Sequence, residues 1–294
     1  MDQKFYVDDY FHIGQMHLGS GKPCQDYSFS GVQGSNAFAV VSDGCSTGRH
    51  TDVGARIVAL STVNTLRQAI ISHRKLNQIH ELVSQEHAQA LYKSIEAFGL
   101  DFQDMLATCI YCLITHEGGL VGIQGDGVIA KVYKDGAMAL SCYQWDNNTP
   151  LYPAYAFDGY KGFIAAHGGD INKESLRAQL CSYSDDGLTI SSNLGISLAE
   201  AIRGREEYIT KQEMDNLSFI AVFTDGVMQV EGMSWQEAVL QLLAFKNVEG
   251  EFAKRRMIRF IKDSKKNDKK GPLDDISYAI IRMKQEDMEV GDGA

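Results

Sequence analysis

The feature that most constrains this chain is a repeated local pattern, in which an apolar, strand-like run ends in Asp-Gly. The pattern occurs three times far apart in the sequence: FAVVSDG at Asp43, GIQGDG at Asp126 and FIAVFTDG at Asp225. A carboxylate at the end of a buried strand is well placed to face a cleft, and the adjoining glycine permits close backbone approach. Several such strands side by side would therefore bring their carboxylates together.

Three more aspartates adjoin similar runs. Asp274 and Asp275 come directly before ISYAII, and Asp26 opens the apparent strand DYSFSGV. Like charges held at close range are costly unless cations neutralise them. A site made only of oxygen ligands suits Mg²⁺ or Mn²⁺. Two such ions can bridge and activate a water for in-line attack on phosphorus.

A single Asp-Gly pair is weak evidence, because it is also the commonest hairpin turn signal. The KDG at 134–136 is expected to be only such a turn. Asp43 and Asp225 differ from it, since each is followed by a segment that leads into a helix and not by a complementary short strand. These two positions therefore favour a functional interpretation.

The distribution of elements predicts an α+β fold. An amphipathic stripe begins at residue 51 and reaches Ile70, because apolar residues recur there every three or four positions. Further helices are expected over 76–97, 234–245 and 249–263. Strands rich in Val, Ile, Phe and Tyr are expected over 36–42, 107–115, 119–124, 127–133, 137–143, 217–224 and 276–283, with hairpin connections at 116–119 and 134–136. This order favours sheets between helical layers over a parallel βαβ fold.

Length and composition fit one large domain, which we expect to span residues 1–284, with an acidic, disordered tail over 285–294. The net charge of -10 would repel nucleic acid. The dense basic run Lys265, Lys266, Lys269 and Lys270 is better explained as a solvated loop than as a binding site. No run approaches the roughly 18 apolar residues that span a bilayer, and the N-terminus does not look like a signal peptide. We therefore expect a cytoplasmic protein that binds neither membrane nor nucleic acid.

Cysteine and histidine patterns favour structural interpretations. The six cysteines are expected to be free thiols. Cys109 and Cys112 lie in a strand-like run, so their side chains should point to opposite faces and not share a metal. His73, His80 and His87 recur every seven residues, and a polar helix surface is favoured there over a metal site.

Taken in order, the motifs QD at 25–26, VVSDG at 40–44, GDG at 125–127, FTDGV at 223–227 and DDIS at 274–277 resemble those of the PP2C (PPM) phosphatases. The resemblance covers roughly residues 10–283 and is strongest to the compact bacterial branch. It implies two antiparallel sheets packed face to face and flanked by helices. It also implies a metal-dependent hydrolase of phosphoserine and phosphothreonine in proteins, with two Mg²⁺ or Mn²⁺ ions. A phosphorylated protein is the implied partner, together with a cognate serine/threonine kinase.

The resemblance also implies roles for individual residues. Asp43 would bridge the two metals, and the carbonyl of Gly44 would contact the second. Asp225 and Asp274 would complete the protein ligands of the first metal. Asp26 would orient the attacking, metal-bridging water, Asp126 would help to hold a more weakly bound third ion, and Asp275 is the weaker ligand candidate of its pair.

This chain departs from the family pattern in three places. Gln25 stands where an acidic residue is common, and Cys45 stands where some members carry histidine. Many members also place an arginine before Asp26 to grip the phosphate, whereas this chain has no arginine before residue 49. His17 and Lys22 are the nearest cationic candidates for that role, and we prefer His17 because it is expected to end the preceding strand-like run.

Two alternatives to a protein phosphatase stay open at this point. One is a catalytically weak or inactive PP2C-like module that binds a partner, and the other is a hydrolase of a small phosphate ester. Specificity would reside in loops such as 144–160 and 167–200. The aromatic residues Trp145, Tyr152, Tyr155 and Tyr160 could line a substrate groove there, but ordinary packing is the favoured explanation.

Overall fold

Two antiparallel sheets form the centre of the protein in the computed structural model, which describes residues 5–266 and 271–284. The seven-stranded sheet has the order β1 (Phe5–His12), β12 (Ile276–Met283), β11 (Leu217–Phe223), β6 (Gly127–Tyr133), β7 (Met138–Trp145), β8 (Glu174–Ser184) and β9 (Gly187–Ser197). The five-stranded sheet has the order β10 (Arg205–Ile209), β5 (Gly118–Gln124), β4 (Cys109–Thr115), β3 (Asn36–Asp43) and β2 (Asp26–Gln33). All pairings are antiparallel.

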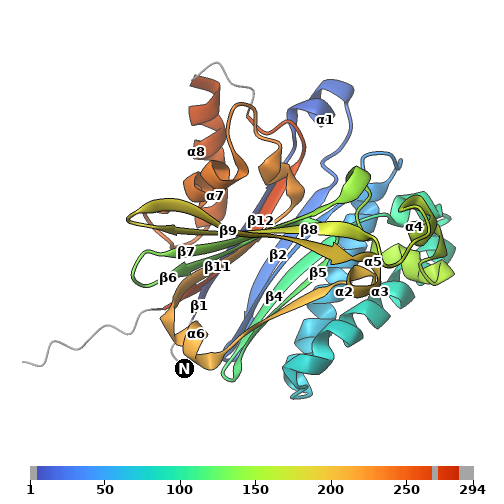
Figure 1. The fold of residues 1–294 in the computed structure, drawn as a ribbon, viewed down its shortest axis with the longest axis horizontal. Helices are drawn as coiled ribbons and strands as arrows, with labels where there is room; N and C mark the ends of the chain where they lie inside the picture. The colour runs from blue at the N-terminus through green and yellow to red at the C-terminus, as the bar shows by residue number, and fades with distance from the viewer. Residues whose placement is uncertain (1–4, 267–270, 285–294) are drawn as a thin grey trace, which may run out of the picture.

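Helices cover the outer faces of the two sheets, on opposite sides of the molecule (Figure 1). The long pair α2 (Thr51–Ile71) and α3 (Leu76–Phe98) packs on the five-stranded sheet. The pair α7 (Trp235–Leu243) and α8 (Phe252–Lys266) packs on the seven-stranded sheet. The other α-helices are short: α1 (Gln15–Ser20), α4 (Lys161–Ala166), α5 (Leu198–Ala201) and α6 (Lys211–Asn216). The predicted α+β sandwich with flanking helices is therefore confirmed.

Strand β3 shows why a strand in this fold can be apolar at every successive position. Its side chains alternate between two cores, as the pleat requires. Ala39 and Val41 face the core between the sheets, while Phe38 and Val40 face the core beneath α2 and α3. All four side chains are fully buried. A strand covered on both faces must be apolar along its buried length, which places β3 inside the sandwich with the half-buried Asp43 at its end.

Most of the predicted elements are present, and their ends differ by a few residues. The strand expected from 107 begins at Cys109, and the helix expected over 249–263 is Phe252–Lys266. The connections at 116–119 and 134–136 join the antiparallel pairs β4–β5 and β6–β7. Cys109 and Cys112 face different cores, as expected, and all six cysteines are free.

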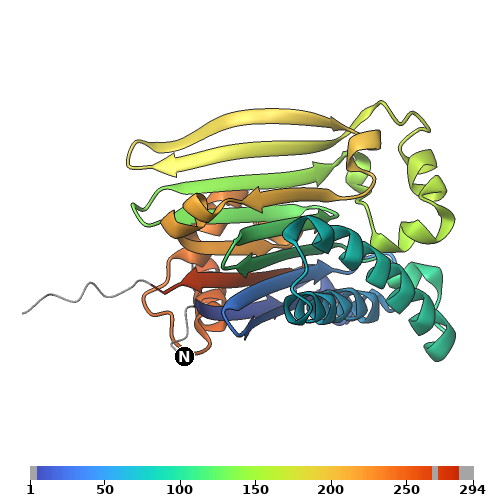
Figure 2. The ribbon, with the colours of Figure 1, turned by 90° about the horizontal axis from the view of Figure 1, so that it is seen from below.

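The structure corrects the assignment of 167–200 as a loop. That segment contains β8 and β9, which form a long hairpin at the outer edge of the seven-stranded sheet (Figure 2). In the other predicted specificity loop, 144–160, Trp145 is buried and donates a hydrogen bond through Nε1 to the Gly125 carbonyl oxygen at 2.8 Å. Tyr152 is buried as well, while Tyr155 and Tyr160 are half-buried and pack against the inter-sheet core. The packing explanation for these aromatic residues is the one that the structure supports.

The predicted polar helix surface at the α3 histidines is wrong. His80 and His87 are buried against the five-stranded sheet, whereas His73 is exposed beyond the end of α2. His87 bonds to Gln124 Oε1 at 2.9 Å and to the Thr62 hydroxyl at 2.7 Å. His80 bonds to the Tyr111 hydroxyl at 3.0 Å.

Two sequence predictions fall wholly or partly on segments that the structure does not describe. The predicted tail at 285–294 lies outside the described residues, as do Lys269 and Lys270 of the basic run. In the part of the chain that is described, no helix is long and apolar enough to cross a membrane.

Candidate metal centre

The aspartates singled out by the sequence meet at one end of the sandwich, where strand ends from both sheets come together. Asp43 is the last residue of β3 and pairs across the five-stranded sheet with Asp26, the first residue of β2. Asp225 follows β11 and Asp274 precedes β12, and these two strands are neighbours in the seven-stranded sheet. Asp126 lies between β5 and β6, where the chain passes from one sheet to the other.

A hydroxyl connects the aspartates of the five-stranded sheet, Asp26 and Asp43, to those beside the seven-stranded sheet, Asp225 and Asp274. The Thr224 Oγ1 donates a hydrogen bond to Asp26 Oδ2 at 2.6 Å, although the two residues belong to different sheets. The backbone N–H of Ser277 donates to the same Thr224 oxygen at 2.9 Å, which orients the hydroxyl. Both Thr224 and Asp26 are buried. The position of Asp26 is therefore fixed by β11 and β12 as well as by its own strand.

One side-chain amide donates hydrogen bonds to both carboxylates beside the seven-stranded sheet, Asp225 and Asp274. Gln229 lies in the segment after Asp225, and its Nε2 donates to Asp225 Oδ2 at 3.1 Å and to Asp274 Oδ2 at 3.2 Å. One amide group thus contacts two carboxylates that are distant in sequence. This geometry brings Asp225 and Asp274 within reach of a common ligand.

The carboxylates of the cluster raise one another's pKa. Burial is the largest cause for Asp43, whose pKa lies well above its usual range, and the charges of Asp26, Asp225 and Asp274 add to it. Burial likewise raises the pKa of Asp225 to about 6, and Asp274 contributes. Burial raises the pKa of Asp26 to about 8, against the hydrogen bond from Thr224, which lowers it, and the charges of Asp275 and Asp225 add to the rise. In all three residues burial is the main cause of the raised pKa, and neighbouring carboxylates add to it.

Asp126 belongs to the same electrostatic cluster. It is buried, and its pKa is raised by burial first and then by the charge of Asp225. Its flanking residues Gly125 and Gly127 have φ values of 126° and 143°, a backbone region that favours glycine. The sequence Gly-Asp-Gly is therefore required by the crossover between sheets, and it is not a hairpin turn.

The second aspartate of the Asp274–Asp275 pair has local hydrogen-bond partners. Asp275 is buried and accepts hydrogen bonds from the backbone N–H of Gly14 at 2.7 Å and of Gln25 at 2.5 Å. Its Oδ2 also lies 2.8 Å from His17 Nδ1. Asp275 thus ties the start of the chain to the site, and its lower ranking as a ligand stays a prediction.

The two cationic candidates occupy different environments. His17 lies in helix α1, not at the end of a strand, and it is buried with its Nε2 4.0 Å from Asp274 Oδ1. Lys22 is exposed, and its Nζ donates to the backbone carbonyl of Ser46 at 2.7 Å, in the loop after Asp43. A role in gripping phosphate stays a prediction for both residues.

The oxygen donors of this cluster are of the kind that divalent cations prefer. Among the described residues, the group whose potential ligand atoms all lie within 4.8 Å of one another is His17, Asp274 and Asp275. The side-chain oxygens of the aspartate cluster belong to carboxylates, and among the ion pairs of the described residues none involves Asp26, Asp43, Asp126 or Asp225. The Oδ1 of Asp26 is buried and has no hydrogen-bond partner within the described part of the chain. Buried carboxylates are normally paired or coordinate metals. Hard, all-oxygen donors of this kind suit Mg²⁺ or Mn²⁺.

Two glycines let the backbones approach closely at this site. A Cβ on Gly226 would lie 1.8 Å from the Asp275 carbonyl oxygen, and one on Gly44 would lie 2.5 Å from the Thr51 carbonyl oxygen. The glycine after Asp225 and the glycine after Asp43 are therefore needed for packing of the strand ends, as the motif predicted.

Three residues of the site were given no role from the sequence, although Gln25 and Thr224 lie within its motifs. They are Thr224, Gln229 and Gln25, whose Nε2 donates to the Thr51 hydroxyl at 2.6 Å. Only proximity in sequence marks them, because Thr224 and Gln229 flank Asp225 and Gln25 precedes Asp26. Their partners come from other elements, so the contacts depend on the tertiary fold.

Comparison with known proteins agrees with this geometry. Residues 13–149 match the family model described as "Protein phosphatase 2C". The fold matches a bacterial serine phosphatase bearing an R161K mutation, at 11% identity and a TM-score of 0.57, with 96% of this chain and 99% of that chain covered. It also matches the serine/threonine phosphatase Stp1 from Staphylococcus aureus, at 11% identity and a TM-score of 0.54, with 97% and 98% covered.

The serine/threonine phosphatase PstP/Ppp of Mycobacterium tuberculosis is a third match, at 11% identity and a TM-score of 0.52, with 96% of this chain and 99% of that chain covered. A search of curated protein sequences found no match. Residues 13–149, which contain the first three motifs, are thus similar to protein phosphatase 2C, and the whole chain shares the fold of bacterial serine/threonine phosphatases.

Proposed function

We propose that this protein is a metal-dependent phosphomonoesterase that hydrolyses phosphoserine and phosphothreonine in proteins. The proposal rests on one observation: Asp26, Asp43, Asp225 and Asp274 lie at the same end of the sandwich, and no ion pair of the described residues involves Asp26, Asp43 or Asp225. The family match and the fold support a protein phosphatase as the class of activity.

Asp43, Asp225 and Asp274 would hold the cations, with the Gly44 carbonyl as a further ligand and Asp126 beside a third, weaker position. When bound, two divalent cations would polarise the phosphoryl oxygens and activate a water for direct attack on phosphorus. No covalent intermediate on the protein is needed.

The chain's own residues would set the geometry of this reaction. Asp26 presents Oδ1 as an unpartnered acceptor, while Thr224 holds its Oδ2. The free oxygen would accept a hydrogen bond from the attacking water and orient it toward the phosphorus. Gln229 would keep the carboxylates of Asp225 and Asp274 from rotating, because it donates to both.

The partners follow from the activity. The substrate would be a phosphorylated protein in the cytoplasm, phosphorylated by a cognate serine/threonine kinase. A small phosphate ester as substrate, or a partner-binding module without activity, would require a different outcome in the assays below.

The test is hydrolysis of p-nitrophenyl phosphate and of a phosphothreonine peptide, with and without Mn²⁺. We expect hydrolysis of both substrates with Mn²⁺, its loss in EDTA and its recovery on adding Mn²⁺. Asp225→Asn should lose activity and keep its fold. Asp215→Asn is the matched control, because Asp215 is an exposed aspartate in an ion pair with Lys211 on α6.

The outcomes separate the alternatives. Hydrolysis of the small ester but not of the peptide would identify a small-ester hydrolase. A protein that binds no Mn²⁺ or Mg²⁺ in calorimetry and hydrolyses neither substrate would be a partner-binding module. Activity that is insensitive to chelators would contradict the metal-dependent mechanism.

A further inference from the structure

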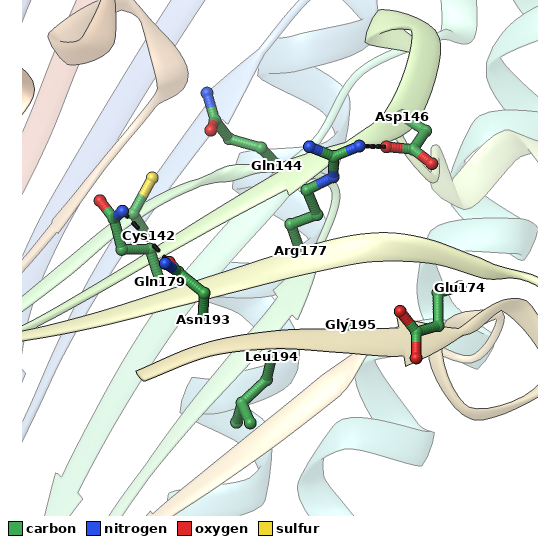
Figure 3. A pocket seen from close by; sticks show the side chains of 9 residues that line it. All are labelled: Cys142, Gln144, Asp146, Glu174, Arg177, Gln179, Asn193, Leu194 and Gly195. Atoms are coloured by element: carbon green, nitrogen blue, oxygen red, sulfur yellow. Dashed lines mark hydrogen bonds and ion pairs between the residues drawn. The ribbon is translucent and has the colours of Figure 1, made fainter. Parts of the chain in front are cut away.

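A groove of about 490 Å³ lies on the seven-stranded sheet beside the start of α7. Side chains from β7, β8 and β9 line it, and Figure 3 shows Gln144, Gln179 and Arg177 on the same face of these strands. The start of α7 closes one side, because Trp235 Nε1 donates to Gln179 Oε1 at 3.1 Å. The aspartate cluster does not include these residues, so the groove is a separate feature.

The strand register places this groove next to the candidate metal centre. Gln144 pairs with Arg177, and Gly127 pairs with Tyr143, so Asp126 lies level with Gln144 on the neighbouring strand. Gln144 and Arg177 therefore lie on adjacent strands, and Asp126 lies next to them in the crossover directly before β6. Neighbouring strands lie about 4.8 Å apart, which puts the Arg177 backbone about 10 Å from that of Asp126.

The inner end of the groove contacts the segment that begins at Asp225. Cys142 lines the groove, and its Sγ lies 3.2 Å from Sδ of Met228, in the short 3-10 helix Asp225–Met228. The groove therefore lies beside the segment that carries one of the proposed metal ligands.

The chemistry of the lining suits an extended peptide. Gln144, Gln179 and Asn193 offer amide groups that can both donate to and accept from a peptide backbone. Among the described residues that line the groove, Arg177 alone carries a positive charge. Its side chain is 77% exposed and contacts Asp146 Oδ1 through one nitrogen at 3.0 Å (Figure 3).

This ion pair leaves the guanidinium available to a ligand. Exposed ion pairs contribute little to stability, and a guanidinium has five N–H donors of which the contact with Asp146 occupies few. Arginine also binds carboxylate and phosphate groups in a bidentate geometry. In a chain with a net charge of -10, Arg177 is a local positive group beside the site.

We infer that this groove holds the polypeptide of the substrate next to its phosphorylated residue, and that Arg177 binds an acidic side chain of that polypeptide. The inference rests on the proposed phosphatase function and adds a substrate preference to it. An extended chain advances about 3.3 Å per residue, so about 10 Å corresponds to about three residues. The preferred acidic residue should therefore lie about three positions from the phosphorylated one.

The experiment is a phosphopeptide series in which a single glutamate is moved from four residues before the phosphothreonine to four residues after it. The reference peptide carries glutamine at every one of these positions. We expect the wild type to show a kcat/KM about three- to fivefold higher for glutamate at one position, about three residues away, as for an exposed charge pair. Arg177→Gln should remove this gain, and Arg177→Glu should reverse it.

Two further variants separate recognition from loss of fold. Asp146→Asn frees the guanidinium of Arg177 and should increase the preference for glutamate. Arg259→Gln is the matched control, because Arg259 is an exposed arginine that pairs with Asp263 on α8. All variants should hydrolyse p-nitrophenyl phosphate at the wild-type rate, since that ester is too small to reach Arg177.

The possible failures are distinguishable. If the wild type hydrolyses p-nitrophenyl phosphate with Mn²⁺ but shows no glutamate preference, or if Arg177→Gln keeps the preference, the inference is wrong and the proposed function stands. If no variant hydrolyses any phosphate ester, the proposed function and this inference fall together.

Discussion

Replacing Asp225 with asparagine should make the metal-free protein more stable at alkaline pH, although it removes a proposed metal ligand. Burial and Asp274 raise the pKa of Asp225 from 3.8 to about 6. The folded protein therefore binds more protons than the unfolded chain between these two values. Stability falls as the pH rises through this window and levels off above about pH 6.

The size of the effect follows from the pKa difference. A shift of one unit corresponds to about 1.4 kcal/mol, so the ionised carboxylate costs the metal-free fold about 3 kcal/mol at pH 8 and roughly half of that at pH 5. Asparagine has nearly the same shape and cannot ionise. For a domain of this size, 1 kcal/mol shifts Tm by roughly 2–4 °C, so Asp225→Asn should melt roughly 6–12 °C higher at pH 8 in EDTA.

The assay is thermal unfolding followed by circular dichroism at pH 5 and pH 8, in EDTA and in saturating Mn²⁺. With Mn²⁺ the order should reverse, because the wild type gains stability from binding and the variant gains little. Asp215→Asn serves as the control, and its Tm should equal that of the wild type both in EDTA and in Mn²⁺. A metal-free Asp225→Asn that is no more stable than wild type at pH 8 would refute the claim that unneutralised carboxylates strain this site.

Three further predictions concern contacts around the centre and in the helical layer. Gln229→Ala removes the donor shared by two proposed ligands and should weaken Mn²⁺ binding by about tenfold or more in calorimetry, with unchanged affinity arguing against an orienting role. Thr224→Val removes the bond to Asp26 Oδ2 and should lower kcat more than Mn²⁺ affinity in steady-state and binding assays; equal losses would point to general disruption. Burial lowers the pKa of His87 from 6.5 to about 4, so stability should fall as the pH drops from 6.5 toward 4, and His87→Gln should reduce that acid sensitivity in a melting series.

Much of the fold could be predicted because its central elements follow simple periodicities. Strand β3 is apolar on both faces, and α2 carries a regular apolar stripe, so each produces a clear pattern. The hairpin of β8 and β9 was missed because it lies at the edge of its sheet. Leu188, Ile190 and Leu194 are exposed there, so burial imposes little alternation on that segment.

For β1 the sequence indicated only a strand-like run before His17, without bounds, because the acidic residues of this strand find partners only in the folded protein. Asp9 accepts hydrogen bonds from the hydroxyls of Ser28 and Ser30, at 2.8 and 2.7 Å. Asp8 Oδ2 accepts from the backbone N–H of Ala253 at the start of α8, at 2.5 Å. In the sequence alone the same residues made the N-terminal segment look polar and mixed.

The candidate site also contains some residues that the sequence revealed and others that it did not. Its aspartates were visible because each follows or precedes an apolar run, and a neighbouring glycine marks the close approach of backbones. The residues that orient them, such as Gln229, were not visible, because an amide that contacts two distant carboxylates has no local pattern. Buried His80 was likewise mistaken for a surface residue, since its partner Tyr111 lies on another element.

Metal binding by the aspartate cluster can be tested by calorimetric titration of Mn²⁺ into the wild type and into Asp43→Asn at pH 8. We expect the wild type to bind two ions and the variant to lose that binding, while its fold persists by circular dichroism. A wild type that binds no divalent cation, or an Asp43→Asn protein that binds Mn²⁺ as the wild type does, would contradict a metal centre at these aspartates.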